Sequence, residues 1–219
     1  MPSKMGFHID PPPITVAVRS IKCIEETDEV GSDEPYVIVV AANLTGTPPG
    51  VEATRYGPWD DVDKGELHET VPLPLPPGFP EFLMNIGHIT RRPFWGLDNK
   101  TAQKIRHTKD VIFLVAVLEN DDGEPDAARV LAKEAVLGSL VASMASPRPI
   151  RVQKAIHDMN AALVLPTGGP SFDEHIDSTK ELDLTATDLL RPILGPHSRE
   201  LSFAGDGGHY TVEFVFTKA

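Results

Sequence analysis

Alternation of apolar and polar residues marks the first predicted strand, residues 14–24, and the last one, residues 210–217. A period of two is typical of a strand that buries one face and exposes the other. Residues 36–44 (YVIVVAANL) and 111–118 (VIFLVAVL) are almost continuous apolar runs, which predicts strands buried on both faces. The last strand follows residues 200–203 after a GDGG turn, so the chain is predicted to end in a β-hairpin.

Residues 126–163 follow a helical period instead. Residues 126–145 and 150–163 each repeat apolar side chains three or four positions apart, and Pro147 and Pro149 separate the two stretches. We therefore predict two helices that form a hairpin and pack on the sheet. The side chains expected to face the sheet are Val130, Leu137, Val141 and Met144 in the first helix, and Val152, Ile156, Met159 and Leu163 in the second.

The remaining segments are rich in turn-forming residues. The chain contains 21 prolines and 17 glycines, which an all-helical bundle would not tolerate. Residues 1–13 are predicted to form an extended arm, residues 68–73 a short strand and residues 98–107 a short helix. Strands near both ends of the chain, without a regular βαβ series, favour a mainly β fold. We predict that residues 14–219 form a single antiparallel β-sandwich with a helical hairpin inserted at about 126–163.

The composition of the chain limits which partners and which cellular locations we expect. The chain has 20 Lys and Arg against 32 Asp and Glu, a formal net charge of -12 at pH 7. Such a chain repels nucleic acid phosphates, so we predict no nucleic-acid partner. The single cysteine, Cys23, cannot form an intramolecular disulfide. No apolar stretch has the length of a transmembrane segment or the pattern of a cleaved signal peptide. We expect a cytoplasmic protein, or one exported without a cleaved signal peptide.

Three short segments concentrate carboxylates: residues 25–34 (EETDEVGSDE), 59–66 (WDDVDKGE) and 119–126 (ENDDGEPD). The first lies between two predicted strands, and the third follows one. Packing many carboxylates together costs Coulomb repulsion, which a divalent cation would reverse. Calcium takes about six to eight oxygen ligands, and carboxylates from separate loops provide them well. We therefore expect a calcium site at one end of the sandwich.

Two of these segments resemble a known family. GSDEPYVIV, residues 31–39, resembles the SDPYV signature that closes the first calcium loop of C-two domains, which are calcium-dependent phospholipid-binding modules. VAVLENDDGEPD, residues 115–126, resembles the third loop of that family. The resemblance implies an eight-stranded antiparallel sandwich with an ion site at one tip. The chain departs from the family in the additional Glu34, in Glu119 where Asp is usual, and in having no lysine-rich strand for anionic lipid.

The resemblance also implies which side chains hold the ion. Asp28 and Asp33 would be ligands from the first loop, and Asp121, Asp126 and Glu119 from the third. One residue of the segment 59–66 would add to the site, either Asp60, Asp61 or Asp63. The predicted metal ligands are thus Asp28, Asp33, Asp61, Asp63, Glu119, Asp121 and Asp126, with Ca²⁺ as the cofactor.

Three hypotheses about function follow. The first is a non-enzymatic, calcium-binding interaction module with a protein or a lipid surface as its partner. The second is a structural or assembly protein of the same fold whose acidic loops bind no metal. The third is a metal-dependent enzyme around His175, because imidazole and carboxylate groups suit zinc or iron. The groups considered with His175 are Asp173, Glu174, Asp177, His197 and His209.

Overall fold

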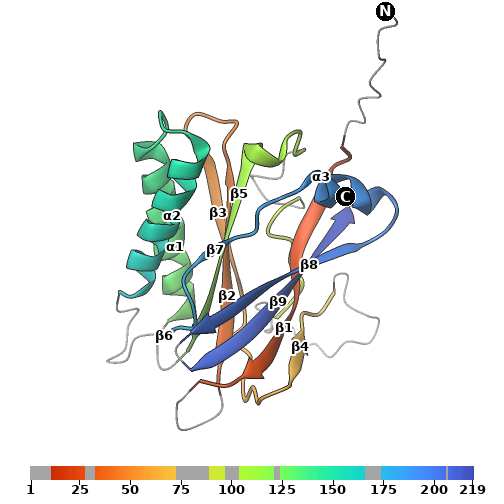
Figure 1. Ribbon diagram of the computed structural model, residues 1–219, viewed down its shortest axis with the longest axis vertical. Helices are drawn as coiled ribbons and strands as arrows, with labels where there is room; N and C mark the ends of the chain where they lie inside the picture. The colour runs from red at the N-terminus through yellow and green to blue at the C-terminus, as the bar shows by residue number, and fades with distance from the viewer. Residues whose placement is uncertain are drawn as a thin grey trace, which may run out of the picture.

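Two antiparallel sheets form the frame of the protein (Figure 1). The computed structural model describes residues 11–27, 33–72, 89–96, 104–120, 124–165, 174–205 and 207–219. The first sheet has the strand order β4-β1-β9-β8, with β1 at Ile14–Glu25, β4 at Leu67–Glu69, β8 at His197–Gly205 and β9 at Gly208–Lys218. The second has the order β3-β2-β5-β6, and β7 also pairs with β5. Its strands are β2 at Pro35–Asn43, β3 at Gly50–Tyr56, β5 at Val111–Glu119, β6 at Glu174–His175 and β7 at Lys180–Glu181. This arrangement confirms the predicted mainly β, antiparallel sandwich.

Helices cover one outer face of the sandwich. Helices α1 (Pro125–Ala142) and α2 (Arg148–Leu163) follow β5 in the chain and lie side by side against the second sheet (Figure 1). Three short elements complete the description: η2 at Thr108–Asp110, α3 at Ala186–Leu190 and η3 at Arg191–Ile193. Among the described residues, no helix is long and apolar enough to cross a membrane.

The second sheet lies between two hydrophobic cores, which explains the continuous apolar runs in β2 and β5. Val37 and Val39 join the core between the sheets, whereas Ile38 and Val40 join the core beneath the helices. All nine residues of β2 and all nine of β5 are buried. A strand covered on both faces needs apolar side chains at every position, so the alternation seen in β9 is lost.

The first helix turns a different face to the sheet from the one predicted. Val130, Val141 and Met144 are exposed, whereas the predicted Leu137 is partly buried and packs against the core beneath the helices. The face that packs on the sheet consists of Ala128, Ala132, Val136 and Leu140. These four residues recur every fourth position and thus also share one face of a helix. The small alanines let α1 approach β2 and β3 closely. In α2 the predicted Val152, Met159 and Leu163 are buried, and Ile156 packs against the same core.

Other predicted elements have mixed outcomes. Strand β4 lies where a short strand was expected. Of the predicted helix at 98–107, residues 98–103 lie outside the described residues, and 104–107 are not helical. Residues 1–10 of the predicted arm also lie outside the described residues. Strands β3, β6 and β7 were not predicted. β6 and β7 have two residues each, too few to show a period, and β3 lies in a stretch rich in proline, glycine and charge that was read as connections.

The strands give the molecule two distinct ends. At one end, Pro35 at the start of β2 pairs with Glu119 at the end of β5. At the other, Asn43 pairs with Val111. Nine residues of strand separate these ends by about 25–30 Å. Figure 1 shows β6 and the end of β1 toward the bottom of the view, and α3 with the C-terminus toward the top.

Candidate functional site at the acidic end of the sandwich

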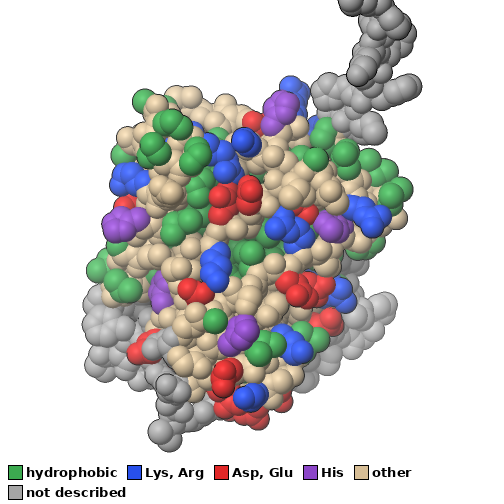
Figure 2. All heavy atoms as spheres, viewed as in Figure 1, with side chains coloured by type: hydrophobic (Ala, Val, Ile, Leu, Met, Phe, Trp, Pro, Cys, Tyr) green, Lys and Arg blue, Asp and Glu red, His purple; other side chains and the backbone are tan. Residues whose placement is uncertain are grey.

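The three acidic segments meet at the end of the sandwich where β5 finishes. The Asn120 N–H donates to the Glu34 carbonyl at 3.2 Å, which joins the third segment to the first. The Val62 N–H donates to the Asp33 carbonyl at 3.0 Å, which joins the second segment to the first. We call this surface the acidic end; it consists of the described parts of residues 25–34, 59–66 and 119–126. In Figure 2 red side chains, the colour of Asp and Glu, lie at the bottom of the molecule, with one blue side chain among them.

The Asp33 carboxylate lies inside this end rather than on its surface, since the residue is only 2% exposed. Thr27 donates to it twice, from the backbone N–H at 3.0 Å and from the hydroxyl at 2.7 Å. The Tyr210 hydroxyl donates to it from β9. Burial, together with the adjacent Asp33 carboxylate, raises the pKa of Tyr210, so this hydroxyl keeps its proton and remains a donor. Asp33 thereby fastens the first acidic segment to the first sheet, and both of its oxygens already accept hydrogen bonds from the protein.

Glu119 also faces inward. It is 4% exposed, and its Oε1 accepts a hydrogen bond of 3.1 Å from the Glu34 N–H. The Asn120 side-chain amide donates to Glu34 Oε2 at 2.9 Å. These two contacts link Glu34, the residue before β2, to the last residue of β5 and to the residue that follows it. Glu119 therefore holds the first and third acidic segments together, a role that the sequence pattern did not indicate.

Asp61 and Asp63 lie on the exposed surface of the acidic end. Asp61 adopts φ +54°, a left-handed conformation that Asp tolerates better than most residues. The next residue, Lys64, joins this segment to the first: its N–H donates to Glu26 at 2.5 Å, and its ammonium lies 3.7 Å from Glu25. The segment 59–66 thus contributes outward-facing carboxylates and one cation that partly offsets them.

Asp126, in the first turn of α1, forms ion pairs with two arginines, Arg55 of β3 and Arg129 of α1. Its Oδ1 lies 3.3 Å from Arg55 Nε and 3.1 Å from Arg129 Nε. Burial by itself raises the pKa of Asp126, but the two guanidinium groups outweigh it and lower the pKa. The remaining predicted ligands, Asp28 and Asp121, lie outside the described residues. Within the described part of the chain, no group of three or more His, Cys, Asp or Glu side chains is placed to hold a metal ion.

The histidines considered with His175 do not gather around it. His197 pairs with Phe216 and His209 with Ala204, which places them at opposite ends of the β8–β9 hairpin. His197 Nε2 lies 2.9 Å from Asp188 Oδ1, and His209 Nε2 lies 2.7 Å from the Ser202 hydroxyl. His175 is half-buried beside Leu118, and this burial lowers its pKa. His197 and His209 therefore cannot bind one ion together with His175, and a metal-dependent enzyme that uses other groups around His175 stays a prediction.

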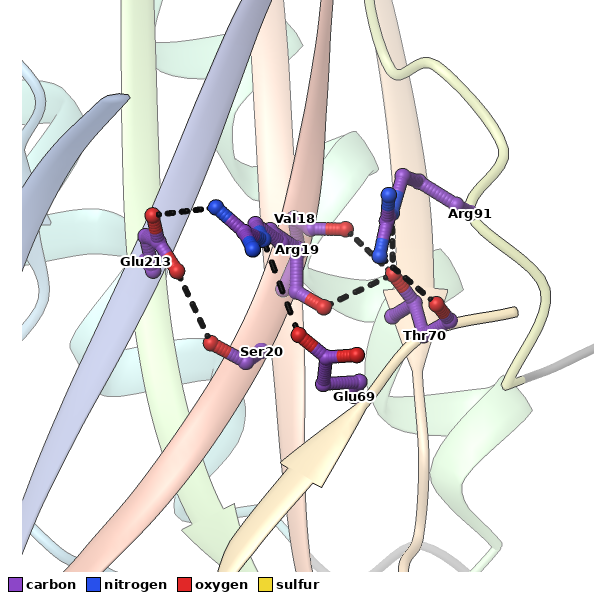
Figure 3. A network of polar contacts seen from close by, with 7 residues as sticks. All are labelled: Val18, Arg19, Ser20, Glu69, Thr70, Arg91 and Glu213. Atoms are coloured by element: carbon purple, nitrogen blue, oxygen red, sulfur yellow. Dashed lines mark hydrogen bonds and ion pairs between the residues drawn. The ribbon is translucent and has the colours of Figure 1, made fainter. Parts of the chain in front are cut away.

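A second polar network lies on the edge of the first sheet, away from the acidic end (Figure 3). The register of β1 against β9 shifts between Val18 and Ser20, as at a β-bulge. The Thr70 hydroxyl contacts both carbonyls at this shift, that of Val18 at 2.8 Å and that of Arg19 at 2.9 Å. Arg91 Nε then donates to the Thr70 hydroxyl at 2.9 Å. These contacts satisfy buried backbone groups and fix the chain on both sides of residues 73–88, which suits a structural role.

Sequence reasoning missed the donors that hold Asp33, namely Thr27 and Tyr210. One signal was available, because Tyr210 falls on the buried face of the alternating last strand, and a buried tyrosine hydroxyl needs a partner. Comparison with known proteins identifies no relative: no family model, curated protein or solved structure matches this chain. The candidate site therefore has to be judged from its own residues.

Proposed function

We propose that the protein is a non-enzymatic interaction module whose acidic end binds calcium. One observation supports this proposal: segments that lie up to about a hundred residues apart in sequence bring their carboxylates to the same end of the sandwich. Backbone hydrogen bonds fix the three segments against one another, which keeps their carboxylates, and the repulsion between them, at the same end. A divalent cation relieves that repulsion most effectively.

The structure changes the expected ligand set. Asp33 and Glu119 face inward and bond to protein donors, so they position the acidic segments rather than contact the ion. The proposed ligands are the exposed Asp61 and Asp63, with Asp28 and Asp121 from the two neighbouring segments. Calcium accepts flexible coordination by carboxylates and water, and such a surface site suits it better than it suits magnesium, which demands near-ideal octahedral geometry.

Thermal unfolding of chelator-treated protein tests the proposal. A ligand that binds only the folded state, at about 100 times its dissociation constant, adds about 2.7 kcal/mol to stability. For a chain of this size that amounts to a rise in Tm of about 5–10 °C. The variant Asp61→Asn/Asp63→Asn should lose most of this rise, whereas Glu200→Gln, an exposed carboxylate in the middle of β8, should keep it. An equal calcium response in both variants would remove Asp61 and Asp63 from the site.

A second candidate is a metal-free structural or assembly module of the same fold. It is favoured by the observation that several acidic groups at this end already have protein partners: Asp33 has Thr27 and Tyr210, and Asp126 has Arg55. For this candidate the Tm of the wild type should be the same with calcium, with magnesium and with chelator. Isothermal titration with calcium should then give only heats of dilution.

A further inference from the structure

Charge is distributed unequally between the two ends of the sandwich. At the acidic end, exposed carboxylates are contributed by Asp60, Asp61, Asp63, Glu66 and Glu124. At the far end, where β2 finishes and β5 begins, the exposed charged side chains include several cations. In Figure 2 blue and purple side chains, the colours of Lys, Arg and His, lie at the upper right of the molecule with one red side chain beside them, while several red ones lie at the bottom.

The cations of the far end come from three separate parts of the chain. Arg106 and Lys109 lie just before β5 and in η2, Arg191 begins η3, and Lys218 ends β9; all four are exposed. Lys218 pairs with Ile14, and His197 pairs with Phe216. The start of β1, the start of β8 and the end of β9 therefore lie at the same end of the sandwich as η2, which directly precedes β5 (Figure 1). We call the surface formed by Arg106, Lys109, Arg191 and Lys218 the basic end.

Two carboxylates at this end are turned into the protein, and the exposed one, Asp183 between β7 and α3, offsets only part of the charge of the four cations. Asp188 is 1% exposed, and its oxygens accept hydrogen bonds from His197 and Arg199, each at 2.9 Å. Asp110 is half-buried and accepts a hydrogen bond of 3.2 Å from the His107 N–H. Both carboxylates therefore serve the fold, while the cations point outward.

We propose that the basic end of one copy docks on the acidic end of a second copy, so that the protein associates head to tail. A second copy is the expected partner because the two ends carry opposite charge. Although the net charge of the chain is -12, its acidic end and its basic end lie about 25–30 Å apart along the strands and complement each other. The association uses two different surfaces and is therefore heterologous, which gives open chains or closed rings rather than a self-limited two-fold dimer. This inference does not depend on calcium binding.

Screening by salt decides whether the attraction between the two facing ends or the repulsion between two chains of net negative charge dominates. At an ionic strength of about 0.15 M the Debye length is about 8 Å, so charges at remote ends of two touching copies hardly interact. The facing ends lie within a few ångströms of each other and still attract. The association should therefore be weak, persist at physiological salt and disappear at about 0.5 M salt.

Charge reversal of each end separately provides the test. The first variant, Arg106→Glu/Lys109→Glu/Arg191→Glu, leaves Lys218 against three new carboxylates, so both ends are acidic. The second, Asp60→Lys/Asp61→Lys/Asp63→Lys, sets three new lysines against Glu66 and Glu124, so both ends carry an excess of cations. Control variants change the net charge in the same directions away from the ends: Gln153→Glu/Lys154→Glu on α2, and Glu134→Lys/Glu200→Lys on α1 and β8. Sedimentation velocity with chelator present, over a range of protein concentrations and salt, gives the weight-average mass of each protein and of mixtures.

The wild type and both controls should gain mass with concentration at about 0.05–0.15 M salt and return to single chains at about 0.5 M. Each end-reversed variant alone should associate at least about tenfold more weakly, and an equimolar mixture of the two should associate again. This recovery also shows that both variants are folded. A wild type that stays a single chain at all salt concentrations, or controls weakened as much as the end-reversed variants, would overturn the proposal. Chelator in every sample keeps the result separate from calcium binding, which has its own titration.

Discussion

The buried carboxylate of Asp33 allows a quantitative prediction. Tyr210→Phe removes one of its three hydrogen bonds and leaves the shape of the core unchanged. A hydrogen bond to a charged group contributes about 1.5–3 kcal/mol, so we expect the free energy of unfolding to fall by this amount. Asp33→Ala removes all three and leaves the donors of Thr27 and Tyr210 without this acceptor, which should cost about 3–5 kcal/mol.

The assay is urea unfolding, monitored by circular dichroism, of both single variants and the double variant. Because both substitutions break the same bond, the double variant should lose at least about 1 kcal/mol less than the sum of the single losses. Asp63→Ala, an exposed carboxylate at the same end, is the matched control and should change stability by no more than about 0.5 kcal/mol. The m-values should not change. A loss below about 0.5 kcal/mol for Tyr210→Phe, or additive losses in the double variant, would refute the assigned role of Asp33.

Three further predictions concern other parts of the fold. Burial lowers the pKa of His175, so the unfolded state binds more protons below pH about 6.5; stability should therefore fall as the pH drops from about 7 to 5, and His175→Gln should flatten this dependence in urea titrations at several pH values. Thr70→Val removes the hydroxyl donor of the Val18 carbonyl at the β1 bulge, while the Arg19 carbonyl keeps the backbone N–H of residue 70; the change should cost about 1–3 kcal/mol in the same assay, and an equal stability would refute the network of Figure 3. Leu140→Ala should cost about 2–5 kcal/mol, but Val141→Ala less than about 1 kcal/mol, and the reverse order would show that the wrong face of α1 was assigned to the core.

The fold class could be predicted because the long strands carry strong patterns. β2 and β5 are apolar at nearly every position, and β9 alternates without a break. Their burial patterns follow directly from whether one or both faces are covered. Sequence could not reveal the order of strands within each sheet, because that order depends on contacts between residues far apart in the chain, such as Ile14 with Lys218.

The inward face of α1 could not be read from the sequence because the helix has two apolar stripes. The stripe with the larger side chains, including Val141 and Met144, was expected to be buried. The sheet instead accepts the stripe of Ala128 and Ala132, whose small side chains permit close approach. Total hydrophobicity therefore misled the prediction, and the space available between helix and sheet decided the outcome.

At the candidate site, the sequence predicted that acidic segments meet at one end of the sandwich. It did not predict which carboxylates are buried and which are exposed. Asp33 and Glu119 look like Asp61 and Asp63 in sequence, yet the first two point inward and the second two are exposed. The difference arises from donors elsewhere in the chain, such as Tyr210 for Asp33. A pattern within one segment does not contain that information.

Luminescence of terbium, a stand-in for calcium, excited through tryptophan tests the central claim most directly. Trp59 belongs to the acidic end, whereas the backbone of Trp95 pairs with Val16 near the start of β1, at the far end. If the acidic end binds the ion, terbium should luminesce with the wild type and with Trp95→Phe, lose most of its signal with Trp59→Phe, and be displaced by calcium. A signal that survives in Trp59→Phe, or that calcium does not reduce, would contradict calcium binding at this end.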